Sequence, residues 1–305
     1  MDWILLFGGL IGLFVGGEAL VRGSVGIARR MAIPPLLIGL TVVGFGTSTP
    51  ELLVSVDAAL RGVPDIAIGN ILGSNIGNVL LIVGLAALVW PIRVMGGTLA
   101  RDTAVMMAAA LALVPLFWTG QVGRLSGALL VGGLIAYLVL AYRRPGAMPP
   151  DEDPTPVLPL WQAILWVAAG LGALMLGARF LVDGAVNIAR GFGVSEAFIG
   201  LTIVAVGTSL PELATSLIAA LRRQSEIAIG NIVGSNIFNV LGILGMTALI
   251  APIPVADRFP VFDLPVMIVV SAALTALLLL RPQIGRLAGV GLLVAYAGYV
   301  WAAQG

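Results

Sequence analysis

The chain contains two copies of one sequence. Residues 39–84 align without a gap on residues 200–245, and 30 of the 46 aligned positions are identical. The matching strings are GFGTSTPEL with AVGTSLPEL, followed by IAIGNILGSNIGNVL with IAIGNIVGSNIFNVL. A match of this length is too extensive to be accidental, so we expect the two halves to fold as two copies of one structural unit.

The two copies lie in a chain that is too apolar for a water-soluble domain. Hydrophobic residues make up 59% of the sequence and charged residues 10%, and the mean hydropathy is +1.09. Soluble domains carry about 25% charged residues, whereas apolar stretches of about 17–25 residues cross a bilayer as helices. The sequence predicts ten such spans, near residues 3–21, 36–60, 66–89, 102–118, 124–142, 160–182, 197–221, 227–250, 260–280 and 284–302.

The spacing of the two copies predicts opposite orientations in the membrane. Five spans separate each element from its counterpart, and an odd number of crossings reverses the direction of the second copy. We therefore expect an all-α membrane protein of ten transmembrane helices in two inverted five-helix repeats, a plan that places binding sites at the bilayer midplane. The expected units are residues 1–142 and 160–305, joined by a linker at 143–159 that contains six prolines.

The arginines predict which side of the membrane each loop faces. On the ten-span plan, the loops on one side contain eleven of the 16 arginines and those on the other side contain five. Positive residues are enriched in cytoplasmic loops. We therefore expect both termini outside and the linker 143–159 in the cytoplasm, in the inner (plasma) membrane of a prokaryote.

The composition also excludes several kinds of chemistry. The chain has no Cys, His or Lys, which removes thiol catalysis, Cys/His zinc sites and Ser-His or Ser-Lys dyads. The net charge of +1 argues against nucleic acid as a partner. The remaining reactive groups are carboxylates, hydroxyls, amides and backbone carbonyls, and such oxygens suit hard cations such as Ca²⁺, Mg²⁺ or Na⁺.

One glutamate lies in the middle of each repeat, Glu51 in span 2 and Glu212 in span 7. An ionised glutamate near the centre of a membrane helix costs about 2.5–3.5 kcal/mol on insertion scales. No Arg lies within these central stretches to neutralise the two carboxylates. A bound cation is the simplest remaining partner, and the competing interpretation is a protonated structural glutamate.

A proline precedes each glutamate and predicts a break in its helix. Pro50 and Pro211 lack the backbone N–H and clash with the carbonyl four residues earlier, which loosens the helix around Thr47 and Thr208. Irregular backbone at membrane depth is tolerated only where it is buried or lines a cavity. At helical spacing, the residues that share a face with the glutamates are Thr47, Ser48, Thr208 and Ser209.

Spans 3 and 8 supply a second set of polar groups. Ser74 and Asn78 lie four residues apart on one helix face, as do Ser235 and Asn239. The neighbouring glycines allow close helix approach and local breaks, and Asn70, Asn75, Asn231 and Asn236 could satisfy freed backbone groups. Together with the glutamates these groups predict an oxygen cage for one Ca²⁺ or several sites for Na⁺. The alternative is that the small residues serve helix packing alone.

Other charges fall near helix ends and predict structural ion pairs. Asp57 lies four residues before Arg61, and Glu18 lies four residues before Arg22. The counterparts of Glu18 and Arg22 in the second repeat are Arg179 and Asp183, so the charges are exchanged but a pair is again available.

The GTS-x-PE and GN-I-x-GSN-I-x-N strings resemble the two alpha repeats of the cation/calcium exchanger superfamily, specifically its prokaryotic sodium/calcium exchanger-like branch. The resemblance covers essentially the whole chain. It implies that Glu51 and Glu212 are the central carboxylates and that backbone carbonyls near Gly44 and Ala205 join the ligands. The other implied ligands are Thr47, Ser48, Ser74, Asn78, Thr208, Ser209, Ser235 and Asn239. It also implies that spans 1 and 6 slide past the remaining bundle.

Two sequence features bear on which branch of that superfamily the chain resembles. Relatives often carry Asp where this chain has Asn239, and potassium-dependent members share that Asp, so Asn239 argues against potassium co-transport. Proton-coupled relatives tend to show a GNA-x-EH string, and this chain has no His.

The sequence therefore predicts an antiporter that exchanges Na⁺ for Ca²⁺ by alternating access. It requires the lipid bilayer but no cofactor and no obligatory protein partner. A Ca²⁺/H⁺ antiporter is the main alternative, followed by a cation channel. An intramembrane enzyme is disfavoured because neither glutamate has a partnered nucleophile.

Overall fold

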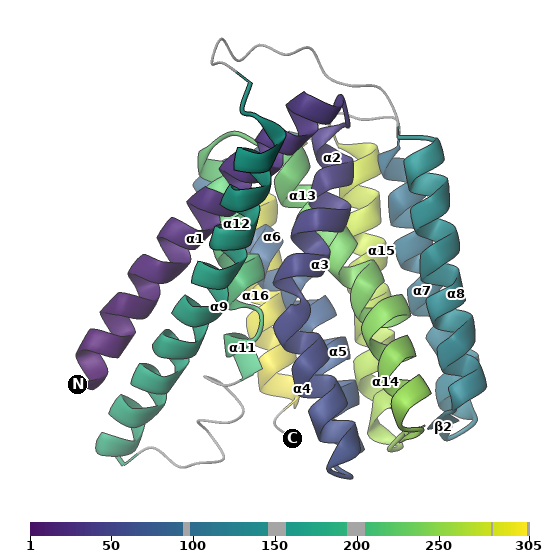
Figure 1. Cartoon of the computed structure of the whole chain (residues 1–305). Helices are drawn as coiled ribbons and strands as arrows, with labels where there is room; N and C mark the ends of the chain where they lie inside the picture. The colour runs from purple at the N-terminus through teal and green to yellow at the C-terminus, as the bar shows by residue number, and fades with distance from the viewer. Residues whose placement is uncertain (94–97, 146–156, 194–204, 282, 304–305) are drawn as a thin grey trace.

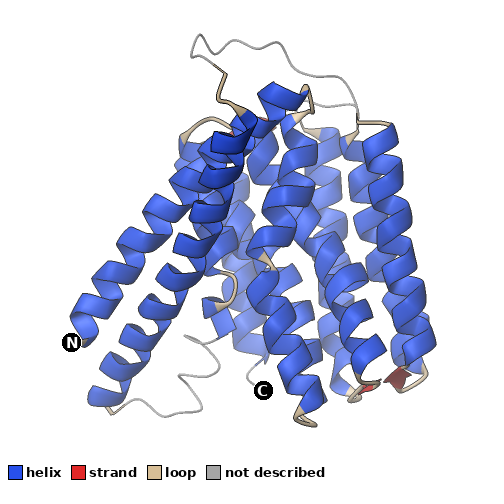
Figure 2. Ribbon diagram, viewed as in Figure 1, coloured by secondary structure: helices blue, strands red, loops and turns tan. Residues whose placement is uncertain are grey.

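The computed structural model describes residues 1–93, 98–145, 157–193, 205–281 and 283–303, and almost all of them are helical (Figure 2). The elements of the first half are α1 (Asp2–Met31), α2 (Pro35–Ile38), η1 (Gly39–Val43), α3 (Gly44–Thr47), α4 (Thr49–Leu60), α5 (Pro64–Gly77), η2 (Asn78–Ile82), α6 (Val83–Val89), β1 (Ile92–Arg93), α7 (Leu99–Trp118), β2 (Gln121–Val122) and α8 (Arg124–Arg143). The η elements are π-helical turns.

The described elements of the second half follow a similar order. Its elements are α9 (Leu160–Gly191), α11 (Ala205–Gly207), α12 (Leu210–Leu221), α13 (Ser225–Ile237), η4 (Phe238–Leu244), α14 (Gly245–Ile250), β3 (Ile253–Pro254), η5 (Phe259–Asp263), α15 (Leu264–Leu280), β4 (Gln283–Ile284) and α16 (Arg286–Ala303). The short strands join the halves, because β1 pairs antiparallel with β4 and β2 pairs antiparallel with β3.

Within the described residues, eight helices are long and apolar enough to cross a membrane, and the bent pair 35–47 and 49–60 makes a ninth span. The predicted span 197–221 begins in 194–204, outside the described residues, and its described part includes the shorter apolar helix α12. Nine of the ten predicted spans therefore have a counterpart of spanning length. Most of the linker 143–159 also lies outside the described residues.

The two longest helices, α1 and α9, lie side by side and run in opposite directions, inclined to the main bundle (Figure 1). Glycines let their backbones touch: a Cβ added to Gly16 would lie 2.7 Å from the backbone nitrogen of Leu174, and one on Gly177 would lie 2.7 Å from that of Leu13. Such small-residue contacts are the usual way in which membrane helices approach closely. Repeat-related helices are thus antiparallel here, as an inverted repeat requires.

Both helices are longer than the sequence predicted. The expected spans were 3–21 and 160–182, but α1 contains 30 residues and α9 contains 32. A helix of 30 residues is about 45 Å long, more than the roughly 30 Å hydrocarbon core. Arg22 does not end α1, because its guanidinium lies 4.9 Å from the centre of the Trp166 ring on α9. The predicted ends at residues 21 and 182 were therefore too early, since the two helices run to Met31 and Gly191.

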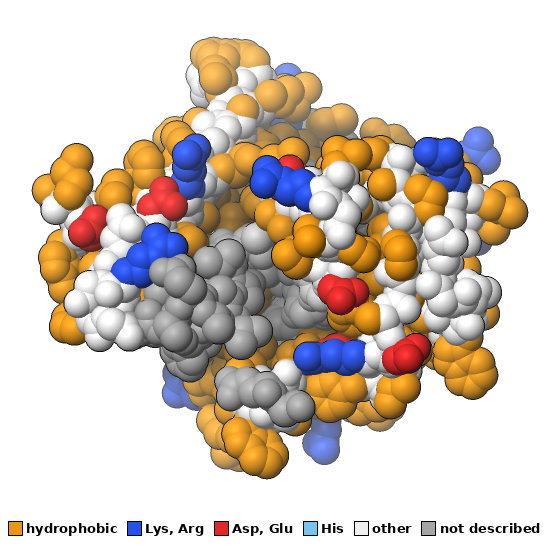
Figure 3. All heavy atoms as spheres, turned by 90° about the horizontal axis from the view of Figure 1, so that it is seen from below, with side chains coloured by type: hydrophobic (Ala, Val, Ile, Leu, Met, Phe, Trp, Pro, Cys, Tyr) orange, Lys and Arg blue, Asp and Glu red, His pale blue; other side chains and the backbone are white. Residues whose placement is uncertain are grey.

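Two spans form the centre of the bundle. The apolar window of 225–250 is completely buried and that of 64–89 is 78% buried, compared with 11% for α16. Most of the remaining helices surround this pair and present hydrophobic side chains outward. Seen from below, hydrophobic side chains form most of the perimeter, while the visible acidic side chains lie on the end face (Figure 3).

The predicted helix breaks occur at the prolines but not in the glycine-rich spans. The chain bends by 44° between 35–47 and 49–60, and Ser48 lies at the bend. In the second half, Thr208 and Ser209 lie between α11 and α12. Spans 3 and 8 were expected to break as well, but each is a continuous helix of 26 residues. They contain no interior proline, and their distortion is limited to the π-helical turns η2 and η4, which contain Asn78 and Asn239.

Candidate ion-binding site

The two predicted glutamates are buried at the starts of two half-helices. Glu51 lies in the first turn of α4 and Glu212 in the first turn of α12, directly after the proline in each case, and each is 1% exposed. The break before each helix leaves backbone N–H groups without helical partners, and a helix N-terminus stabilises a negative charge. Proline thus creates the backbone environment that a buried carboxylate requires.

Each glutamate is held by the serine of the other repeat. Ser48 Oγ donates a hydrogen bond to Glu212 Oε1 over 2.8 Å, and Ser209 Oγ donates to Glu51 Oε1 over 3.1 Å. The sequence predicted that each serine shares a helix face with its own glutamate. The structure corrects this, because the break in each span turns the serine toward the opposite carboxylate.

The threonines also reach across to the other repeat. Thr47 Oγ1 lies 3.1 Å from Asn231 Oδ1, and Thr208 Oγ1 lies 3.4 Å from Asn70 Oδ1. The same two asparagines brace the glutamates: Asn231 Nδ2 donates to the backbone carbonyl of Glu212, and Asn70 Nδ2 to that of Glu51. Spans 3 and 8 therefore bind the backbone of each half-helix at the glutamate itself.

The serines of spans 3 and 8 join the same cluster. Ser74 Oγ lies 3.3 Å from Ser209 Oγ, and Ser235 Oγ donates to the backbone carbonyl of Gly44 over 3.2 Å. The predicted carbonyl at Gly44 thus lies among the other predicted groups. Its counterpart Ala205 is the first residue of α11.

Four buried oxygens that belong to predicted ligands have no hydrogen-bond donor among the described residues. They are one oxygen of each glutamate and one of each predicted asparagine ligand: Glu51 Oε2, Glu212 Oε2, Asn78 Oδ1 and Asn239 Oδ1. The described residues contain no cluster of three or more acidic side chains. Any cation here would be held by two carboxylates supplemented with neutral oxygens, a donor set suited to hard cations.

A small recess lies beside this cluster. It touches Ser74 and Ser209, and its other walls are small or apolar apart from one tyrosine: Gly73, Gly77, Leu81, Ile82, Val206, Leu213 and Tyr296.

The predicted ion pairs have mixed outcomes. Arg61 Nε lies 2.7 Å from Asp57, and Arg179 Nε lies 3.9 Å from Asp183, so both of these predictions are confirmed. The prediction for Glu18 and Arg22 was wrong. Glu18 binds Arg222, which directly follows α12, with Nε 2.9 Å from Oε2, while Arg22 stacks on Trp166. Sequence spacing favours a neighbour on the same helix and gives no information on a partner from the other half.

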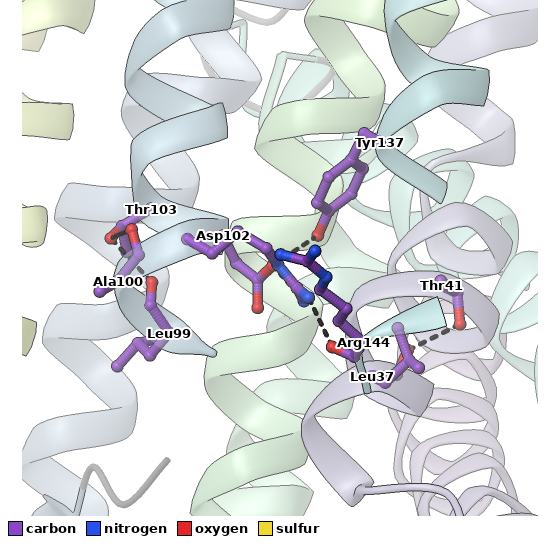
Figure 4. A network of polar contacts seen from close by, with 9 residues as sticks. Leu37, Thr41, Leu99, Ala100, Asp102, Thr103, Tyr137 and Arg144 are labelled. Carbon is purple, nitrogen blue, oxygen red and sulfur yellow. Dashed lines mark hydrogen bonds and ion pairs between the residues drawn. The ribbon is translucent and has the colours of Figure 1, made fainter. Parts of the chain in front are cut away.

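Two buried aspartates outside the central site were missed. Asp102 on α7 accepts hydrogen bonds from Arg101 Nε over 2.8 Å and from the Tyr137 hydroxyl over 3.3 Å (Figure 4). Asp263 does the same with Arg258 and Tyr299. A repeated signal was available, since residues 102–106 and 263–267 share the pattern D-x-x-V-M at the same offset of 161.

Fold and site together define a helical, multi-pass membrane protein in which two equivalent half-chains share one buried, oxygen-rich polar site. The family model described as sodium/calcium exchanger protein matches residues 1–143 and 162–304. The chain therefore belongs to the sodium/calcium exchanger protein family, whose members are cation antiporters and not enzymes.

Relatives of known name agree with this assignment. The chain is 42% identical to the putative antiporter CaxA of Alkalimonas amylolytica, over 97% of this chain and 96% of that protein. It is 38% identical to the inner membrane protein YrbG of Escherichia coli, over 98% and 95%. It is 30% identical to the sodium/calcium exchanger MaX1 of Methanosarcina acetivorans, over 98% and 97%. A structure of the sodium-calcium exchanger NCX_Mj superposes with a TM-score of 0.85 at 32% identity, covering 100% of this chain and 98% of that one.

Proposed function

We propose that this protein exchanges Na⁺ for Ca²⁺ across a prokaryotic inner membrane and that both ions use the oxygens around Glu51 and Glu212. The observation that carries the proposal is the set of four buried, donor-free oxygens on Glu51, Glu212, Asn78 and Asn239. A buried acceptor without a partner costs about 1–3 kcal/mol, and a cation that binds these oxygens removes that cost.

The charge of the site suits this cargo. Two ionised glutamates balance one Ca²⁺, and the ion pairs found among the described residues lie elsewhere, at Asp57, Asp102, Asp183, Asp263 and Glu18. The same oxygens can instead be divided among Na⁺ ions. Because the ligands overlap, binding of one ion opposes binding of the other, and this competition couples their movements in opposite directions.

The remaining ligands of the proposed site are the groups that already contact one another. The hydroxyls of Ser48 and Ser209 hold the glutamates, and Ser74 and Ser235 lie one turn before Asn78 and Asn239 on the same helices. Thr47, Thr208 and the carbonyls of Gly44 and Ala205 complete the set. Alternating access then requires α1 and α9 to move against the bundle, with both termini outside and the linker 143–159 in the cytoplasm.

The test is ⁴⁵Ca²⁺ uptake into proteoliposomes under exchanged gradients. Uptake is expected when Na⁺ is high inside and low outside, and not when a proton gradient replaces the Na⁺ gradient. Uptake driven equally well by protons without Na⁺ would assign the protein to Ca²⁺/H⁺ exchange, and flux without any counter-ion dependence would indicate a channel.

Glutamate variants connect this uptake to the site. Glu51→Gln and Glu212→Gln should abolish Na⁺-driven uptake, because each removes a charge that balances Ca²⁺. Asp57→Asn is the matched control, since it makes the same acid-to-amide change on α4 but at an exposed side chain paired with Arg61. Normal uptake in either glutamate variant would contradict the proposed site.

A further inference from the structure

Two further asparagines hold the amides that carry the donor-free oxygens. Asn239 Nδ2 donates to Asn75 Oδ1 over 2.9 Å, and Asn78 Nδ2 donates to Asn236 Oδ1 over 3.0 Å. We propose that Asn75 and Asn236 are positioning residues: each one sets, from the opposite repeat, the direction in which a ligand amide presents its oxygen. This inference rests on the proposed function, because Asn78 and Asn239 are ligands only if the site binds a cation.

The direction matters because an amide has two different ends. Rotation by 180° about its last bond exchanges an oxygen acceptor for an NH₂ donor at the same position. A cation binds the oxygen and is repelled by the hydrogens of the NH₂ group. An asparagine therefore serves as a cation ligand only if its surroundings hold it in one of the two orientations.

Groups that can only accept hydrogen bonds determine the orientation of Asn75. Its Nδ2 lies 3.3 Å from the backbone carbonyl oxygen of Asn236 and 3.5 Å from Sδ of Met267. Neither a carbonyl nor a thioether donates a hydrogen bond, so the NH₂ of Asn75 must face them. The oxygen of Asn75 then faces Asn239. Asn239 must therefore donate from its NH₂ group, which leaves the Asn239 oxygen without a hydrogen bond.

Equivalent contacts, with the two repeats exchanged, orient the amide of Asn78. Asn236 Nδ2 lies 3.4 Å from the backbone carbonyl oxygen of Asn75 and 3.9 Å from Sδ of Met106. Its oxygen accepts from Asn78, whose own oxygen has no donor. Each repeat therefore orients the ligand of the other, and all the partners are related by the offset of 161.

Burial makes this arrangement effective. The exposed fraction is 3% for Asn75 and 1% for Asn236, Asn78 and Asn239. Solvent therefore does not offer these amides alternative partners, and a rotated amide would place two donors against each other. Outer partners of this kind typically change metal affinity by about 10–100-fold when they are removed.

The test is a double-mutant cycle on equilibrium Ca²⁺ binding, measured by ⁴⁵Ca²⁺ dialysis on the purified full-length protein. Asn75→Ala should raise the Kd for Ca²⁺ by about 10–100-fold. In an Asn239→Ala background the same substitution should change the Kd by less than about twofold, because the amide through which Asn75 acts is already absent. A residue that supports only packing would show the same effect in both backgrounds.

The mirror cycle, Asn236→Ala with Asn78→Ala, tests the inference independently if one variant does not fold. Ser271→Ala is the matched control: it removes a buried hydroxyl from α15, one turn beyond Met267, and should leave the Kd within about twofold, because this hydroxyl makes no hydrogen bond to the four amides in the described part of the chain. If the two substitutions of a cycle changed the Kd independently, so that their fold-changes multiplied, the positioning role would be overturned but the proposed function would not. A wild-type protein that does not bind Ca²⁺ would overturn the proposed function as well.

Discussion

The hydroxyl of Ser48, in the first repeat, donates a 2.8 Å hydrogen bond to the carboxylate of Glu212, in the second. The reciprocal bond runs from Ser209 to Glu51 over 3.1 Å. Neither repeat can therefore form a complete site alone, and the geometry of each carboxylate depends on the position of the other broken helix.

This crossed arrangement predicts a symmetrical effect of removing the serines. Ser48→Ala and Ser209→Ala should each raise the Ca²⁺ concentration for half-maximal uptake by about tenfold, because a hydrogen bond to a charged group contributes about 1.5–3 kcal/mol and part of that is recovered by relaxation. Ser271→Ala is the control, since Ser271 is buried but lies on α15. A large effect of one serine and none of the other would contradict the crossed site.

The contact between α1 and α9 predicts a position-dependent effect of glycine substitution. Gly16→Ala should lower the free energy of unfolding by about 1–3 kcal/mol, because the new Cβ would lie 2.7 Å from the backbone of Leu174. Gly8→Ala, on the same helix, should be neutral or slightly stabilising, since nothing lies within 4 Å of its Cβ position. Thermal unfolding in detergent, followed by tryptophan fluorescence, measures both, and equal effects would exclude close packing at Gly16.

Much of this architecture follows from the sequence for physical reasons. Burial of Glu51 and Glu212 is predictable because a charge inside an apolar span must find a partner, and the breaks are predictable because proline cannot continue a helix. The extent of α1 is not predictable in this way, because the cation–π stacking of Arg22 on Trp166 depends on a residue in the other half. Ion-pair partners that come from the other side of the bundle, such as Arg222 for Glu18, cannot be predicted from the sequence for the same reason.

The ion pair between Arg222 and Glu18 predicts a small difference between equivalent positions of the two repeats. Arg222, directly after α12, binds Glu18 on α1, whereas its counterpart Arg61, directly after α4, binds Asp57 in the last turn of α4. Arg222→Gln should lower the free energy of unfolding by about 0.5–1 kcal/mol, and Arg61→Gln by less, because exposed pairs within one helix contribute about 0.3–0.5 kcal/mol. A larger loss for Arg61→Gln in the same unfolding assay would contradict this difference.

The buried aspartates predict a stabilising role for two tyrosines. Tyr137→Phe should lower the free energy of unfolding by about 1 kcal/mol, because it removes a hydroxyl that donates to buried Asp102. Tyr299→Phe should act similarly through Asp263. Tyr142→Phe, at an exposed position on α8, should have no measurable effect. Unchanged stability in both Phe variants at 137 and 299 would show that these hydroxyls contribute nothing.

The central claim is that Ca²⁺ and Na⁺ compete for the oxygens around Glu51 and Glu212. The most direct measurement is ⁴⁵Ca²⁺ bound to the purified protein as NaCl is raised at constant ionic strength, with choline chloride as the balancing salt. The account predicts that Na⁺ displaces Ca²⁺ completely, with a steeper than one-to-one dependence, while choline does not. Bound Ca²⁺ that is unaffected by Na⁺ would contradict it.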